Sequence, residues 1–138
     1  MLSASAIAAN PAVRYLFVSL PLLSPTVAFE AVFDDVMPRH LSAGHTHLYT
    51  ETSIRHFCSE FGFRRASEWW FGLDVADLFR SLVVSLRGRQ GAGNYLETYW
   101  RETMFPVLDE LQSVLDRGEV CSEVHLLLAK TNIGRPGE

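Results

Sequence analysis

The stretch His45–Phe63, HTHLYTETSIRHFCSEFGF, decides how the middle of the chain folds. Thr50 stands where an N-cap side chain accepts a hydrogen bond from the first helical turn, and Glu51 follows where the helix dipole favours a negative charge. Apolar residues then recur at the helical period of 3.6, namely at Ile54, Phe57, Cys58 and Phe61. Gly62 comes next, where a left-handed C-cap residue is usually needed. The pattern predicts a helix over 51–61 with one apolar face.

Composition and charge restrict the class of protein. The length of 138 residues is that of one domain, and the net charge is −4. The basic residues are scattered, with Arg64-Arg65 as the only adjacent pair, so we expect no nucleic-acid partner. The two cysteines, Cys58 and Cys121, do not make a disulfide framework, and we expect a reducing, cytoplasmic location. We expect Cys58 to be a small buried apolar residue.

An apolar run near the N-terminus, Tyr15–Leu23, is the one stretch that imitates a signal peptide. Its basic residue, Arg14, comes late, Pro21 interrupts the run, and no clear cleavage site follows. The run is also too short to span a bilayer. A secreted protein stays an alternative, but the sequence favours one with no membrane segment.

Three stretches are candidate strands, at 13–20, 64–71 and 124–130, and the first and last of them are nearly continuously apolar. Such stretches suit strands that are buried on both faces, as in a parallel sheet flanked by helices. Helical patterns lie between them at 26–37, 51–61, 74–87, 94–102 and 106–117. Asp74 is the expected cap of the clearest helix and Gly88 its stop, and Pro106 is expected to open the last helix. Strands that alternate with helices predict an α/β fold.

The domain boundaries follow from the same pattern. Residues 1–11 are a helical remnant or a frayed end, residues 12–131 form the folded unit, and residues 132–138 are a disordered tail.

Few residues have a pattern that indicates chemistry. The glycines of Gly88–Gly93 join two predicted helices, which is the wrong context for a phosphate-binding turn. His45 and His47 precede a helix, where they could hydrogen-bond or accept a proton at the mouth of a cleft, or simply orient the loop. Their spacing matches no standard zinc pattern, so we expect no metal site. The sequence Trp69-Trp70-Phe71 is a ligand wall or, as the favoured interpretation, part of the core.

The order of these stretches resembles the second half of a class I S-adenosylmethionine-dependent methyltransferase with a seven-stranded, Rossmann-like sheet. VRYLFVSLP resembles the fifth strand, RRASEWWFG the sixth and SEVHLLLAK the seventh. HTHLYTETSIRHFCSEFGF resembles the family's His-containing loop and the helix after it. The likeness covers about residues 12–131, and its specificity comes from the order and spacing of motifs that are weak singly.

The resemblance implies a partial methyltransferase sheet, its last three strands, flanked by helices. It implies that His45 and His47 position an acceptor or take its proton, while Ser19, Pro21 and Trp70 line the acceptor cleft. The acceptor would be a small molecule or a glycan precursor. S-adenosylmethionine would be the cofactor of the intact enzyme, but this chain lacks the glycine-rich turn that binds it, so no cofactor is expected to bind this chain alone. A truncated reading frame would explain that departure.

Without a fourth strand beside it, the strand at 13–20 would have an open edge, and open edges pair with other chains. Self-association through this strand is therefore expected. The alternative function is a non-catalytic α/β module that binds a protein partner, or itself, through that edge.

Overall fold

The structure of the protein is a computed structural model that describes residues 4–41, 45–89 and 93–131. It is a mixed α/β fold in which helices flank a three-stranded antiparallel sheet. The strands are β1 (Tyr15–Pro21), β2 (Phe63–Phe71) and β3 (Glu123–Lys130). The helices are α1 (Ala4–Ala9), α2 (Pro25–Val32), α3 (Glu51–Phe61), α4 (Asp74–Arg87), α5 (Gly93–Met104), the 3-10 turn η1 (Phe105–Val107) and α6 (Leu108–Arg117). The predicted α/β class is thus confirmed at this level, and the tail at 132–138 lies outside the described residues.

The strand order is β1-β3-β2, and β3 runs antiparallel to both neighbours. Leu20, Val124 and Trp70 lie side by side in one row across the sheet. Because both outer strands oppose β3, β1 and β2 point the same way. The expected parallel pairing of neighbouring strands was therefore wrong, since the last strand of the chain lies between the other two.

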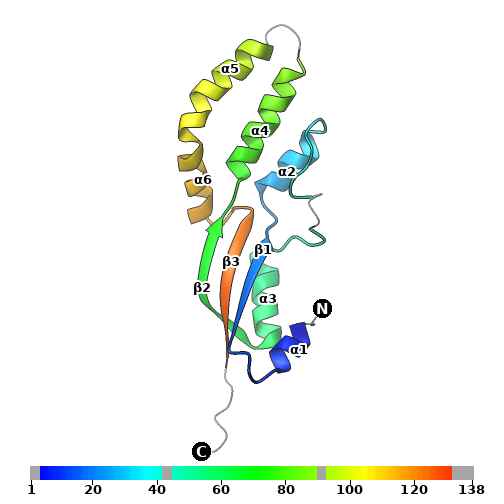
Figure 1. The fold of residues 1–138 in the computed structure, drawn as a ribbon, viewed down its shortest axis with the longest axis vertical. Helices are drawn as coiled ribbons and strands as arrows, with labels where there is room; N and C mark the ends of the chain where they lie inside the picture. The colour runs from blue at the N-terminus through cyan, green and yellow to red at the C-terminus, as the bar shows by residue number, and fades with distance from the viewer. Residues whose placement is uncertain (1–3, 42–44, 90–92, 132–138) are drawn as a thin grey trace, which may run out of the picture.

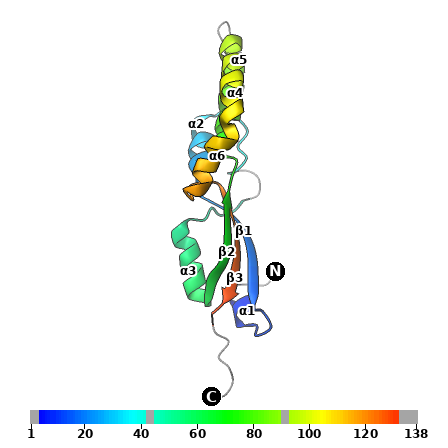
Figure 2. The same cartoon turned by 90° about the vertical axis from the view of Figure 1, so that its left-hand side faces the viewer.

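The prediction that β1 is buried on both faces was also wrong, because its residues alternate between exposed and half-buried. The reason is that α3 covers one face of the sheet and no described helix covers the face opposite (Figure 2). On the covered face, Ile54, Leu126 and Leu128 are almost fully buried and form the centre of the apolar core.

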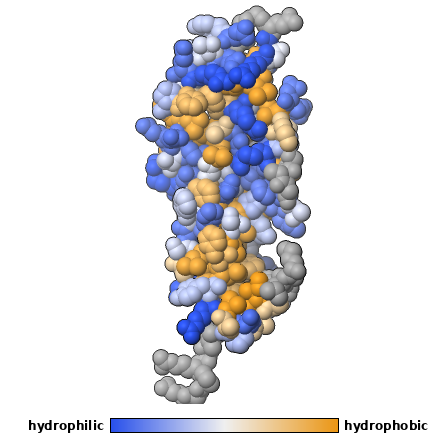
Figure 3. Space-filling view, viewed as in Figure 1, coloured by the Kyte–Doolittle hydropathy of each residue, from blue (hydrophilic) through white to orange (hydrophobic). Residues whose placement is uncertain are grey.

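The open face of the sheet carries large apolar side chains. Tyr15, Phe17 and Trp69 are each more than 60 % exposed, and Leu127 is 37 % exposed. Figure 3, which looks onto this face, shows hydrophobic residues over the sheet in the lower half of the molecule. An apolar sheet face that water still reaches is a surface able to bind something else.

Helix α3 has the predicted bounds and caps. The Thr50 side chain accepts a hydrogen bond from the Ser53 amide at 3.2 Å, and the Ser53 side chain in turn accepts one from the Thr50 amide at 2.8 Å. Gly62 ends the helix in the left-handed region at φ 67°. Cys58 is buried on the apolar face, as expected.

Helices α2, α4, α5 and α6 form an arm beyond one end of the sheet, whereas α1 lies near α3 at the other end (Figure 1). Pro106 lies in the 3-10 turn that joins α5 to α6, which agrees with its predicted place at the start of a new helix. Helix α2 ends at Val32, earlier than predicted, and the chain then folds back toward α2. None of the helices in the described part of the chain has the length and apolar character needed to cross a membrane.

Candidate functional site

Two sets of contacts hold the loop that carries His45 and His47. At its far end, the Tyr49 amide donates to the Pro21 carbonyl at 2.9 Å, and the Leu23 amide donates to the Tyr49 carbonyl at 2.8 Å. At its near end, the side chain of Glu30 accepts hydrogen bonds from the backbone amides of Arg39, His40 and Leu41. The loop is therefore pinned on both sides of the two histidines.

The loop lies over the end of β1 and forms a shallow pocket with it. The pocket has a volume of about 240 Å³ and is lined by Ser19, Leu20, Pro21, His45, Thr46, His47 and Tyr49. Four of the five residues proposed from the sequence thus line one pocket, although the two pairs are more than 20 positions apart in the chain. This pocket could hold a polar group of a ligand beside an imidazole that accepts its proton.

The fifth residue, Trp70, does not line this pocket. It lies in the same row as Leu20 and Val124 and packs against the apolar core on the α3 side of the sheet. Its neighbour Trp69 lies instead in the row of Ser19 and His125. The structure thus favours the core role for Trp70, which was the preferred interpretation of the aromatic triplet.

An aromatic cluster on the open face was missed by sequence reasoning. The ring of His125 meets the rings of Phe17, Trp69 and Phe71 edge-on, with centroid distances of 5.4, 5.6 and 4.6 Å. The sequence does contain a signal for this cluster, because every second residue of a strand points to the same face of the sheet. The strands were interpreted as continuously apolar instead, which hid the side chains that share a face with Ser19.

A buried polar junction between the sheet and the helical arm was also missed. Asp74 is completely buried, and its carboxylate accepts hydrogen bonds from Ser24 Oγ at 2.6 Å, Thr26 Oγ1 at 2.8 Å and the Ser122 amide at 2.8 Å. Burial by itself would raise the pKa of Asp74, but the hydrogen bonds from Ser24, Thr26 and Ser122 together outweigh it and lower that pKa. Asp74 therefore binds α2, α4 and β3 together, and the prediction that it caps α4 was wrong because Leu73 is the N-cap.

Gly72 is needed where this junction is tightest. A Cβ atom at this position would meet the Asp74 carboxylate and would lie 2.7 Å from the backbone nitrogen of Ser122. Real Cβ atoms do not approach other atoms so closely, so only glycine fits between β2 and α4.

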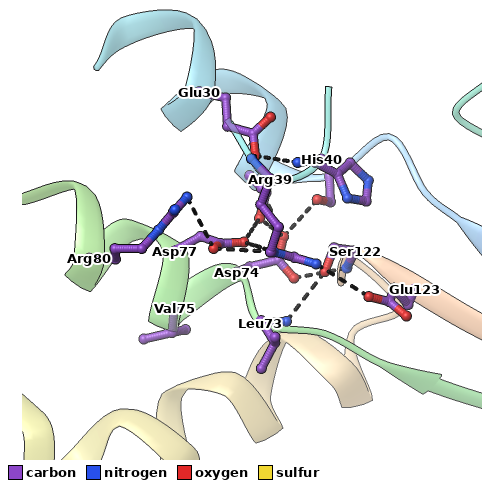
Figure 4. Close-up of polar contacts among 12 residues, drawn as sticks. Glu30, Arg39, His40, Leu73, Asp74, Val75, Asp77, Arg80, Ser122 and Glu123 are labelled. Atoms are coloured by element: carbon purple, nitrogen blue, oxygen red, sulfur yellow. Dashed lines mark hydrogen bonds and ion pairs between the residues drawn. The ribbon is translucent and has the colours of Figure 1, made fainter. Parts of the chain in front are cut away.

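An ion pair extends the junction, as Figure 4 shows. The side chain of Asp77 is 6 % exposed and binds the Arg39 guanidinium through Nη2 at 2.8 Å and Nε at 2.9 Å. Arg39 also contacts the carboxylate of Glu123 at 3.4 Å. This network of charged side chains thus links the start of the histidine loop to α4 and to β3.

His40, between Arg39 and the two loop histidines, is completely buried. Its Nε2 lies 2.8 Å from the Leu22 carbonyl, and its ring meets that of His45 edge-on with centroids 5.3 Å apart. A histidine in a loop carries no burial signal in the sequence, so only the fold identifies this one as a structural residue of the site.

A nucleotide-binding turn needs glycines between a strand and a helix, and a metal site needs several ligands grouped together. Gly88 ends α4 and Gly93 begins α5, so in the described part of the chain no strand leads into these two glycines, and Gly91 lies outside the described residues. Within residues 4–41, 45–89 and 93–131, no three His, Cys, Asp or Glu side chains are grouped so that they could hold a metal ion.

Comparison of the chain with protein-family models, with curated proteins and with solved structures found no match.

Proposed function

We propose that this chain is the C-terminal, acceptor-side part of an S-adenosylmethionine-dependent methyltransferase with a Rossmann-like sheet. The observation that carries the proposal is the place of β3, which comes last in the sequence and lies between β1 and β2, antiparallel to both. In the methyltransferase sheet that the sequence resembles, the seventh strand lies in this way between the fifth and the sixth. Helices connect β1 to β2, as they do in doubly wound sheets.

The location of the histidine pocket also supports the proposal. Ser19 and Pro21 are at the carboxyl end of β1, and His45 and His47 lie across the same pocket. In open α/β sheets, ligands bind outside the carboxyl ends of the strands. The acceptor is a small molecule or a glycan precursor with a hydroxyl or amine group that reaches these histidines.

The cofactor half of the site would come from chain outside these residues, because the resemblance covers only the last three strands of the sheet and places the glycine-rich turn after the first strand. That cofactor supplies a methyl group bound to a sulfonium when it is present. The residues of this chain would bind and orient the acceptor and take up its proton. We place the enzyme in the cytoplasm, where the free thiols of Cys58 and Cys121 would stay reduced.

The genomic DNA upstream of Met1 tests the proposal. We expect a reading frame that encodes a strand followed by Gly-x-Gly and, before the present strands, an acidic residue at the end of a second strand. The protein made from the longer frame should bind S-adenosylmethionine in calorimetry, whereas the present chain should give no heat. Upstream DNA without such a frame, or a longer product that does not bind, would refute the methyltransferase assignment.

The second candidate is a non-catalytic module that associates with itself or with a protein partner. The open edge of β1 and the exposed rings of Tyr15, Phe17 and Trp69 favour it. Another strand can pair with an open strand edge, and the apolar rings beside that edge would pack against it.

Light scattering after gel filtration tests whether the isolated chain associates through its open face. If the open face drives association, Phe17→Lys should convert oligomers to monomers, because it places a charge beside the β1 edge. Tyr95→Lys is a matched control, since Tyr95 is also a largely exposed aromatic residue but lies on α5. A wild-type chain that is monomeric at all concentrations would count against the second candidate, and so would an equal effect of the two variants.

A further inference from the structure

The two histidines of the pocket differ in the atoms that face their rings. His45 Nδ1 lies 3.2 Å from the backbone carbonyl oxygen of His40. A carbonyl oxygen accepts hydrogen bonds and has no hydrogen to give, so the neutral His45 ring must carry its hydrogen on Nδ1. Nε2 of the same ring then keeps its lone pair, and His45 is exposed on the wall of the pocket.

The His40 carbonyl is held in place from three sides. The amide of His40 donates to the Glu30 carboxylate, and the amides on either side of it, of Arg39 and Leu41, donate to the same group. The buried His40 ring donates from Nε2 to the Leu22 carbonyl at 2.8 Å. Its edge also packs against the His45 ring at an interplanar angle of 77°. The acceptor that selects the His45 tautomer therefore belongs to the folded frame and not to a free loop.

His47 lacks this constraint. Its Nδ1 lies 2.9 Å from the hydroxyl of Thr46, which is an exposed residue of the same loop. A hydroxyl group either donates or accepts, so this contact is compatible with both tautomers of His47. The two histidines that the sequence presents as a pair are thus unequal in the structure.

We infer that His45, through Nε2, is the proton acceptor of the pocket, and that His40 and Glu30 are positioning residues that select its tautomer. The group that it serves is a hydroxyl or an amine of the bound acceptor. In that step the O–H or N–H bond breaks, its proton forms a bond to Nε2, and the electron pair stays on the oxygen or nitrogen. The proton-accepting role rests on the proposed function, whereas the tautomer rests on the contacts of His45 alone.

Long-range proton–nitrogen NMR on the ¹⁵N-labelled 138-residue chain tests the tautomer directly. We expect a pyrrole-like shift for His45 Nδ1 and a pyridine-like shift for Nε2 at a pH where the ring is neutral. His47 should show shifts averaged between the two forms and serves as the internal reference. A pyrrole-like Nε2 in His45, or the same averaging for both histidines, would overturn the inference, and the wild-type spectrum suffices for this decision.

Variants of His40 test the positioning role. His40→Gln retains an N–H donor for the Leu22 carbonyl and should leave the His45 tautomer as in wild type. His40→Phe removes the donor and should shift the His45 nitrogens toward averaged values, and Glu30→Gln, which weakens the hold on the three amides, should shift them in the same direction. If both variants fold and leave the His45 shifts unchanged, His40 and Glu30 do not position the ring. Should His40→Phe not fold, the Glu30→Gln spectrum decides the same question.

Activity separates this inference from the function on which its catalytic part rests. In the longer gene product, His45→Gln should lower kcat by about 100-fold, the low end for a general base, with little change in the affinity for S-adenosylmethionine. His47→Gln should lower kcat much less. If the wild-type product transfers no methyl group, the proposed function fails while the tautomer result stands. If the wild type is active and His45→Gln is as active, His45 is not the proton acceptor.

Discussion

Two buried regions, one on a face of the sheet and one at its end, are held together by different forces. Under α3, the core consists of apolar side chains such as Ile54, Leu126 and Leu128. Between the sheet and the helical arm, the junction consists of hydrogen bonds and charges around Asp74 and Asp77. The apolar core tolerates many exchanges of similar volume, whereas the junction requires specific donors at specific places. The junction also fixes the segment from which the histidine loop starts, so we expect its loss to affect the site as well as stability.

The largest effect is expected for Asp74→Asn, because it replaces an acceptor oxygen by an amide group that faces N–H and O–H donors. We expect a loss of about 4 kcal/mol in the free energy of unfolding, in the range for leaving buried charged or polar partners unpaired. Urea denaturation followed by circular dichroism measures it. A loss below about 1 kcal/mol would mean that the junction contributes no more than an ordinary surface network.

Ile54→Ala probes the apolar core in the same way. Ile54 is 2 % exposed, and its truncation should cost about 3 kcal/mol through lost burial and the cavity that remains. This loss should not depend on pH, because no titrating group takes part. Denaturation at pH 7 and at pH 4 measures both properties, and a strong difference between the two pH values would contradict the contrast between the regions.

Gly72→Ala tests the close approach at the junction. The added methyl group meets the Asp74 carboxylate and the Ser122 backbone, and overpacking of this kind costs about 2 kcal/mol. Gly88→Ala is the matched control, since Gly88 has ordinary right-handed backbone angles and a Cβ there would make only an ordinary contact, 3.7 Å from the Ser85 carbonyl oxygen. Thermal unfolding compares the two variants, and equal melting temperatures would refute the steric account.

The pH dependence of stability should come from the junction and the loop anchor. The pKa values of Asp74 and Glu30 lie below their ordinary values of 3.8 and 4.5. Burial would raise the pKa of Glu30, but its hydrogen bonds from the amides of His40, Leu41 and Arg39 outweigh it. A lowered pKa in the folded state contributes stability that is complete above the ordinary value.

This contribution is lost as the pH falls below about 4 toward the folded-state values. The free energy of unfolding in wild type should therefore be steady between pH 5 and 7 and decrease below that window. In Asp74→Asn the decrease should be smaller, because residue 74 no longer titrates. An unchanged slope in that variant would remove Asp74 from the acid response.

The smallest effect is expected for Trp70→Phe. Trp70 Nε1 is buried and has no hydrogen-bond partner in the described part of the chain, so removing it discards an unsatisfied donor while most of the apolar contact remains. The change in unfolding free energy should stay within about 1 kcal/mol. A clearly larger loss, measured by urea denaturation, would indicate that the indole nitrogen has a partner that supports the structure.

Local patterns in the sequence were sufficient for the elements near the site. Thr50, the apolar spacing and Gly62 determine the bounds of α3, because caps and periodicity act over a few residues. The structure brings His45, His47, Ser19 and Pro21 to one pocket, but they were selected from a resemblance and not from periodicity, and their roles stay a prediction. The local signal is strong where a helix begins and ends with its own side-chain hydrogen bonds.

Contacts between distant segments could not be predicted from local sequence patterns. Asp74 looks like a helix cap in the sequence, and its role depends on Ser24, Thr26 and Ser122, which lie about 50 positions away in either direction. Trp69 and Trp70 are adjacent and equally aromatic, and only the pairing register assigns one to each face. Strand register and burial depend on contacts across the whole fold, so the sequence of a single stretch does not determine them.

By itself, the sequence determined which segments are helices and strands, and that the chain has an α/β fold, because these follow from hydrophobic spacing and turn residues. The tertiary structure decided that β3 lies between β1 and β2, that one sheet face stays open, and that Asp74 and His40 are buried. It also made the two loop histidines unequal, since only the folded chain brings the His40 carbonyl to His45 Nδ1. The physical reason is range: caps and periodicity are local, whereas strand order, burial and tautomer selection depend on atoms that meet only after the chain has folded.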